Sequence, residues 1–266
     1  MFVSSATEST FQVMTSLRYD PALPDVVSSY PEGYPEPLRS PYYLLAYHRD
    51  RLIAAARFFQ WNKALEWLQQ DLGSLERFFE GSIPDKQKPW RLGITVDCNG
   101  NGSIDVNPTA AIDPLNLLIP SLRPPIESPI WRVYVDTSAT NPSGFTTHKT
   151  TAREDYTAAR LRVGINSFAE TAEVLVINPA GEIMEGSITT PYFRARGTSG
   201  QAWFTPPLSS GGNDGTTRRY ALAQGFCTEQ TINGAELVDG EECWLSNGVR
   251  GFMRGMVVLN RSPGGN

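Results

Sequence analysis

The sequence has little cysteine and little histidine. Its 266 residues include three cysteines, Cys98, Cys227 and Cys243, and two histidines. Three widely spaced cysteines cannot form a disulfide scaffold, and their low number favours a reducing compartment. So few thiols and imidazoles cannot build a thiolate or poly-imidazole metal site, so zinc hydrolysis is excluded and we expect no bound metal. The absence of a Gly-x-Ser-x-Gly turn excludes α/β-hydrolase chemistry.

The sequence also lacks an excess of positive charge and long apolar runs. Lys and Arg number 23 against 28 Asp and Glu, which gives a net charge of −5 and excludes a basic field for nucleic acid or acidic lipid. No segment of about 18 apolar residues is present, and the first residues lack a basic region followed by an apolar one. We therefore expect a cytoplasmic protein with no membrane or nucleic-acid partner. A soluble enzyme or small-molecule binder remains.

The N-terminal half has the pattern of a small mixed α/β unit. Segment 11–19 is rich in β-formers, and apolar spacing predicts helices over 42–61 and 65–79. Alternating residues around an Asn/Gly turn predict a β-hairpin over 91–106. The acidic turn resembles the front of a calcium loop, but Pro108 stands where a bidentate glutamate is needed, so we interpret it as a plain turn.

The C-terminal half alternates short strands, Gly-rich turns and helices. The patterns predict five elements: strand 130–136, helix 154–163, strand–turn–strand 173–189, short strand 203–208 and helix 217–224. A Ser/Thr/Asn/Pro/Gly-rich stretch over 137–147 separates the first of these elements from the other four and indicates a domain boundary. We predict an α/β (mixed α+β) fold with a small N-terminal domain (1–135), a linker (136–145) and a larger C-terminal domain (146–266) that carries the lysine discussed next.

Three separated features suggest a pyridoxal phosphate site. Lys149 ends a loop that leads into a helix, Glu185 follows 36 residues later on a predicted strand, and a Gly-rich turn then opens a helix at 215–218. A lysine can bind this cofactor covalently and move a proton. A carboxylate can keep the pyridine nitrogen protonated, and helix N-terminal amides with hydroxyls can hold the phosphate.

These segments resemble the class IV, or fold-type IV, pyridoxal-phosphate enzymes over most of the chain. His48-Arg49-Asp50-Arg51-Leu52 is similar to the family's H-x-x-R-L helix, 185–187 to its E-G-S strand, and 215–218 to its G-x-T-R turn. The resemblance implies pyridoxal 5'-phosphate as cofactor and a homodimer. It assigns catalysis to Lys149 and Glu185, and phosphate contacts to Arg51, Thr216 and Thr217.

Within the family, two segments look like the aminodeoxychorismate lyase branch. Residues 148–160 match H-K-T-T-x-R-x-x-Y-x-x-A-R, and 245–251 resemble its N-S-L-R-G segment. Gly248 stands where a phosphate-binding Ser or Thr is usual, so Asn247 or the local backbone is expected to take over that contact. Thr190 and Pro191 also depart from the usual Asn and aliphatic residue.

The resemblance implies a lyase that makes 4-aminobenzoate and pyruvate for folate synthesis. Its dicarboxylate substrate requires cations, for which the candidates are, in order, Arg250, Arg218 and Arg160. His148 is expected to be structural or to lie behind the reacting groups, and Tyr156 is either core or in contact with the cofactor. Two alternatives stay open: an aminotransferase acting on a D-amino acid, branched-chain amino acid or amine, and a non-catalytic relative.

Overall fold

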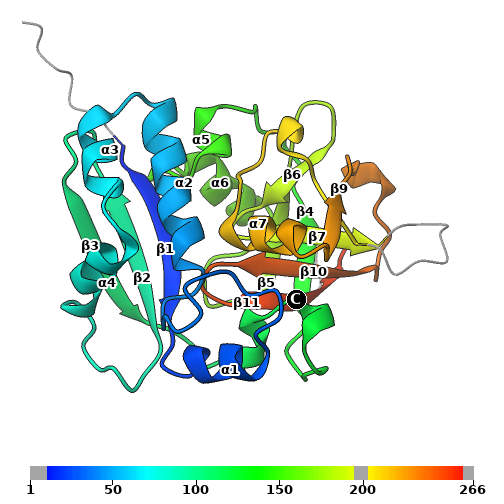
Figure 1. Ribbon diagram of the computed structural model, residues 1–266. Helices are drawn as coiled ribbons and strands as arrows, with labels where there is room; N and C mark the ends of the chain where they lie inside the picture. The colour runs from blue at the N-terminus through cyan, green and yellow to red at the C-terminus, as the bar shows by residue number, and fades with distance from the viewer. Residues whose placement is uncertain (1–10, 195–202, 260–266) are drawn as a thin grey trace, which may run out of the picture.

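The computed structural model describes residues 11–194 and 203–259. In Figure 1 a small sheet with helices lies at the left and a larger sheet at the right. Within the described ranges, no helix is both long enough and apolar enough to cross a lipid bilayer. The arrangement confirms the expected mixed α/β fold.

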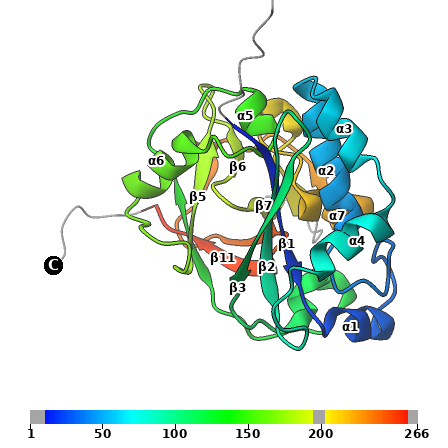
Figure 2. The same ribbon diagram turned by 90° about the vertical axis from the view of Figure 1, so that its left-hand side faces the viewer.

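The small sheet is an antiparallel meander of three strands. Its order is β1-β2-β3, with bounds Val13–Tyr19, Trp90–Val96 and Gly102–Pro108. One face packs against helices of the same half of the chain, as Figure 2 shows. These helices are α2 (Leu45–Phe58), α3 (Asn62–Leu68) and α4 (Leu72–Glu80). The first strand, the first long helix and the hairpin are confirmed, whereas the helix expected over 65–79 is two helices.

The break between α3 and α4 has a local cause. Asp71 is the N-cap of α4 and accepts hydrogen bonds from the backbone N–H and the hydroxyl of Ser74, at 3.0 and 2.7 Å. A capped helix start satisfies free N–H groups, so it favours a new helix over a continued one. The predicted apolar spacing is therefore right, but it spans two elements.

The larger sheet has eight strands in the order β6-β5-β4-β11-β10-β7-β8-β9. In chain order their bounds are β4 Trp131–Val135, β5 Ala172–Ile177, β6 Ile183–Gly186, β7 Thr190–Arg194, β8 Trp203–Thr205, β9 Cys227–Glu229, β10 Glu242–Asn247 and β11 Gly251–Val257. The predicted C-terminal strands are confirmed. The division into two domains stays a prediction, although β4, which it placed in the N-terminal part, belongs to this sheet.

The remaining helices surround the larger sheet and the connection between the sheets. They are α1 (Leu23–Ser29), α5 (Gly144–Thr147), α6 (Glu154–Arg162) and α7 (Thr216–Ala223), with short 3-10 turns at Pro114–Leu117, Pro120–Leu122, Leu208–Ser210 and Gly234–Glu236. Helices α7 and α2 meet through an ion pair of 3.2 Å between Arg219 and Asp50. The contact brings the H-x-x-R-L helix beside the G-x-T-R turn.

Candidate active site

Lys149 lies where the two sheets approach each other. It follows His148, the C-cap of α5, and its carbonyl accepts a hydrogen bond of 2.9 Å from the backbone N–H of Met14 on β1. Burial, then the charges of Arg153 and Arg51, hold the pKa of Lys149 well below its usual range, while Glu185 opposes the shift. Within the described part of the chain, no group hydrogen-bonds to its amino group. The amine is thus held in a setting that favours its neutral, nucleophilic form.

Glu185 is placed by β6 and by a hydrogen-bond donor on α6. The Tyr156 hydroxyl donates to its carboxylate at 2.5 Å. Burial raises the pKa of Glu185, whereas the bond from Tyr156 and the charges of Arg153 and Lys149 lower it. The sequence left the role of Tyr156 open, and the structure places its hydroxyl on the acid.

A buried carboxylate that the sequence analysis missed supports the segment after Glu185. Glu173 on β5 is fully buried. It accepts hydrogen bonds from the Ser187 N–H (3.1 Å) and hydroxyl (2.5 Å), from the Ile188 N–H (3.0 Å) and from the Thr189 hydroxyl (2.7 Å). Its only sequence signal is an acidic residue within the apolar run AEVLVI. Glu173 fixes the turn between β6 and β7 and hence the course of the Glu185 strand.

The N-terminus of α7 lies beside the same strand. A Cβ at Gly212 would lie 2.3 Å from the Met184 carbonyl oxygen, so only glycine lets this loop approach β6 so closely. The N-cap is Gly215, whose lack of a side chain leaves the first N–H groups of the helix without a side-chain cap. Free N–H groups at a helix N-terminus form an anion site. The predicted phosphate residues Thr216 and Thr217 are the first two residues of this helix.

Arg51 projects from α2 toward this helix. Its Nη2 donates to the Thr15 hydroxyl, and its Nε is buried without a hydrogen-bond partner among the described residues. Burial lowers the pKa of Arg51 to about 10, while Glu185 and Asp214 raise it. A buried guanidinium nitrogen without a partner is costly, so an anion here would supply an interaction that the protein itself does not.

Asn247 and Gly248, both predicted to bind the cofactor, lie at the connection between β10 and β11. The Asn247 side chain stabilises this turn, and the Gly248 backbone contacts β1. The Asn247 side-chain oxygen accepts hydrogen bonds from the Val249 and Arg250 N–H groups at 3.0 and 2.8 Å. The Gly248 carbonyl accepts a bond of 2.9 Å from the Arg18 N–H on β1. This turn therefore connects the larger sheet to the smaller one.

Two of the three arginines predicted to bind substrate are used within the protein. Arg218 pairs with Glu229 and Asp214 and donates to the Pro206 carbonyl. The Arg160 guanidinium donates hydrogen bonds to the Ser187 hydroxyl at 3.0 Å and to the Ser167 carbonyl at 2.8 Å. It also lies 3.8 Å from the Glu173 carboxylate.

Arg250 has fewer partners than Arg218 and Arg160, and the charge of Arg91, an arginine that the sequence analysis missed, affects both Arg250 and Lys149. Arg250 donates one bond, to the Phe168 carbonyl at 2.8 Å, and lies over the Trp131 ring. The charge of Arg91 on β2 lowers the pKa values of both Lys149 and Arg250. Within the described ranges, Arg91 pairs with no acidic side chain. Arg91 alternates with the core residues along β2, which indicates that its side chain lies on the other face of the strand. The alternation alone does not indicate that this face borders a site.

His148, which precedes Lys149 in the chain, packs against aromatic side chains. Its ring packs against Phe58 with centroids 4.5 Å apart and against Phe59 at 5.9 Å, at the end of α2. Burial lowers its pKa. The contact joins the loop that carries Lys149 to the small sheet's helices.

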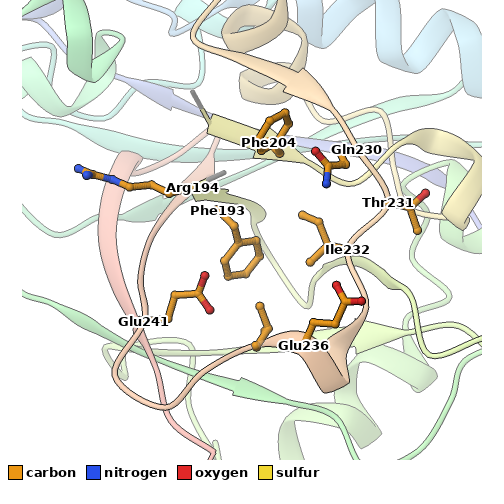
Figure 3. A pocket seen from close by; sticks show the side chains of 9 residues that line it. Phe193, Arg194, Phe204, Gln230, Thr231, Ile232, Glu236 and Glu241 are labelled. Atoms are coloured by element: carbon orange, nitrogen blue, oxygen red, sulfur yellow. The ribbon is translucent and has the colours of Figure 1, made fainter. Parts of the chain in front are cut away.

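A separate pocket lies away from these groups. Figure 3 shows its lining by Phe193, Arg194 and Phe204 from β7 and β8 and by polar and apolar side chains of segment 230–241. None of the predicted site residues lines it. We therefore place the candidate active site around Lys149, not in this pocket.

The residues present fit pyridoxal phosphate. An amine with a lowered pKa and a hydrogen-bonded carboxylate lie close enough to affect each other's pKa. An uncapped helix start and an arginine with an unpartnered buried nitrogen lie beside them. This combination matches a cofactor that needs a covalent lysine, an acid for its ring nitrogen and a cradle for its phosphate.

Residues 38–255 match the model of the amino-transferase class IV family, and the chain belongs to this family of enzymes. An aminodeoxychorismate lyase of Saccharomyces cerevisiae is 38% identical over 138 residues. The match covers 48% of this chain and 37% of the yeast protein, so it extends over well under half the length of that relative.

Solved structures share the fold. A protein provisionally described as an amino-acid aminotransferase from Mesorhizobium loti has a TM-score of 0.67 at 20% identity, covering 93% of this chain and 100% of that one. A hypothetical aminotransferase from Mycobacterium tuberculosis, bound to α-ketoglutarate and PMP, has a TM-score of 0.59 at 16% identity, covering 99% and 89%. At these identities the likeness establishes the fold alone.

Proposed function

We propose that this chain is a pyridoxal-phosphate-dependent 4-amino-4-deoxychorismate lyase that releases 4-aminobenzoate and pyruvate. The convergence of Lys149, Glu185 and Arg51 at the N-terminus of α7 carries the proposal for the cofactor. The similarity to the yeast lyase supports the reaction type, and the PMP-bound neighbour supports the cofactor class.

The proposal gives each group at the centre a role. When bound, pyridoxal phosphate supplies an electron sink for the carbon that bears the substrate amine. Lys149 binds the cofactor and then, as a free amine, takes the proton from that ring carbon, for which its lowered pKa suits it. Glu185, held by Tyr156, keeps the pyridine nitrogen protonated. Arg51 and the first residues of α7, Thr216 and Thr217, hold the phosphate.

The bond changes balance without a second substrate. The ring carbon loses its proton to Lys149, the ether bond to the enolpyruvyl group breaks, and the ring becomes aromatic. The departing enolpyruvate takes up a proton to become pyruvate, and Lys149 is the group placed to return one. No oxidant and no keto acid is consumed.

The two substrate carboxylates require cations that are not already paired. We propose Arg250 and Arg91, because Arg218 and Arg160 are held by acidic partners and carbonyls of the protein. The charge of Arg91 lowers the pKa values of both Lys149 and Arg250, which supports its assignment to the same site. In this proposal Arg160 and Arg218 do not bind substrate, and their contacts within the protein stabilise the segments around the site.

An aminotransferase reaction is the second candidate, favoured by the fold shared with the two aminotransferase structures. The same cofactor residues would serve both reactions. A homodimer, a cytoplasmic location and a role in folate synthesis belong to the lyase proposal.

The purified chain tests the proposal directly. Incubation with 4-amino-4-deoxychorismate and pyridoxal phosphate should release 4-aminobenzoate and pyruvate in a 1:1 ratio. Lys149→Ala should release neither. Formation of pyruvate without 4-aminobenzoate, or of neither product by the unaltered chain, would contradict the lyase reaction.

A further inference from the structure

His48 lies in a chain of side-chain hydrogen bonds that joins the small sheet to α7. Its ring is 1% exposed. Nδ1 lies 2.6 Å from the hydroxyl oxygen of Thr15 on β1, and Nε2 lies 3.4 Å from that of Thr216, the first residue of α7. Arg51, one turn further along α2, donates to the same Thr15 hydroxyl. Four residues thus connect the two sides of the candidate phosphate site.

The Arg51 guanidinium, which can only donate, determines which nitrogen of His48 accepts. Its Nη2 donates to the Thr15 hydroxyl and also lies 3.5 Å from His48 Nδ1, so Nδ1 faces a donor and acts as the acceptor, toward Arg51 and toward the Thr15 hydroxyl. Burial, then the charge of Arg51, holds the pKa of His48 well below its usual range, so the ring is neutral. A neutral ring that accepts at Nδ1 carries its proton at Nε2.

The last bond of the chain therefore runs from His48 to Thr216. Nε2–H faces the Thr216 oxygen, which acts as an acceptor. The Thr216 hydroxyl proton is then directed away from His48. A hydroxyl whose oxygen is already engaged in this way can donate its proton to an anion at the start of α7.

Gly248 provides a second, independent observation. A Cβ at this position would lie 2.6 Å from Cε1 and 2.8 Å from Nε2 of His48, and 2.8 Å from the Ser16 carbonyl oxygen. The His48 ring thus occupies the space that a Ser or Thr side chain at 248 would need. The space beside position 248, which has no hydroxyl, is thus occupied by the His48 ring, and the same ring orients the Thr216 hydroxyl.

We propose that His48 is a positioning residue that makes the Thr216 hydroxyl a donor to a bound phosphate group, in place of the hydroxyl that position 248 lacks. The inference rests on the proposed function, because the phosphate is that of the cofactor. His48 acts through Thr216 and Thr15 and touches no reacting atom.

The test compares affinities for pyridoxal phosphate and pyridoxal, which differ only in the phosphate, by absorbance titration of the full chain. His48→Leu and Thr216→Val should each lower the preference for the phosphorylated form about tenfold, the worth of one hydrogen bond to a charged group. The double variant should lose no more than either single variant, because both remove the same bond. Thr216→Ser keeps the hydroxyl and should keep the preference.

Two results would overturn the inference: an unchanged preference in either single variant, or losses that multiply in the double variant. If His48→Leu does not fold, Thr15→Val against Thr15→Ser makes the same comparison from the other end of the chain. An unaltered chain that forms no borohydride-reducible bond with pyridoxal phosphate would instead overturn the proposed function itself, so the two failures are distinct.

Discussion

The hydroxyl of Tyr156 donates a hydrogen bond of 2.5 Å to the carboxylate of Glu185, joining α6 to β6. The Tyr156 ring is itself held, because the Arg153 guanidinium lies 4.0 Å from its centroid and donates to the Ser187 carbonyl at 2.7 Å. Ser187 is in turn bonded to Glu173. The acid of the candidate site is thus oriented by a connected set of side chains, most of them buried.

Tyr156→Phe should weaken the acid without unfolding the protein. The bond from Tyr156 lowers the pKa of Glu185, so its loss should raise that pKa and leave less carboxylate anion at any given acidic pH. We expect the acid limb of the kcat/KM profile to move to higher pH and kcat to fall roughly tenfold, the cost of a hydrogen bond to a charged group. The pH dependence of product release measures both effects.

Tyr43→Phe is the matched control. Its hydroxyl is buried without a hydrogen-bond partner in the described part of the chain, within a core cluster that includes Tyr34 and Leu117. Its removal should leave the profile in place. A shift of equal size in both variants would show that the effect of Tyr156→Phe is a general packing effect.

Lys149→Ala should abolish the covalent bond to pyridoxal phosphate. The chain has four lysines, at 63, 86, 88 and 149, and the other three precede the larger sheet. Borohydride reduction followed by mass spectrometry should label the Lys149 peptide alone. Lys88→Ala, which changes an exposed side chain, should be labelled like the unaltered chain. Label that persists in Lys149→Ala would identify a different lysine.

Glu185→Gln should separate binding from chemistry. An amide keeps the shape of the side chain but cannot hold the pyridine nitrogen protonated, so cofactor affinity should change little while turnover falls about a hundredfold or more. Titration with pyridoxal phosphate and a turnover assay measure the two quantities. Unchanged turnover would mean that another acid faces the ring.

Glu173→Gln should destabilise the fold. The Glu173 carboxylate accepts hydrogen bonds from Ser187, Ile188 and Thr189, and the N–H groups of an amide would face these donors instead of accepting from them. The substitution also removes the negative charge opposite Arg160. We expect a loss of about 3 kcal/mol in the free energy of unfolding, as for a broken buried ion pair. Urea denaturation measures it.

Glu242→Gln controls for the loss of a charge at the surface. Glu242 is exposed and pairs with Arg254 at 3.1 Å, so its change should cost within about 0.5 kcal/mol. Equal losses at the two positions would contradict the role given to Glu173.

Most helices and strands, and the order of the site motifs along the chain, could be predicted from local sequence patterns. The alternation in WRLGITV and the turn that follows predicted the hairpin, and Lys149, Glu185 and the turn at 215–218 were placed by residue type and spacing. Each of these signals lies within a short segment, where backbone geometry and side-chain chemistry act directly.

The contacts between distant segments could not be predicted in this way. Arg218 was the second candidate for substrate, after Arg250, and the structure pairs it with Glu229 on a different strand. His48 meets Thr216 across 168 residues, and Glu173 is an acid in an apolar run whose partners come from the next turn of the sheet. Such relationships depend on how strands and helices pack, which no single-segment pattern contains.

Dependence on a keto acid tests the central claim most directly. A lyase returns its cofactor unchanged after each turnover, whereas an aminotransferase must transfer the amine to a keto acid before it can act again. We predict steady release of 4-aminobenzoate from 4-amino-4-deoxychorismate at the same rate with and without an added keto acid. Turnover of an amine or amino acid that strictly requires the keto acid, with no 4-aminobenzoate formed, would contradict the account.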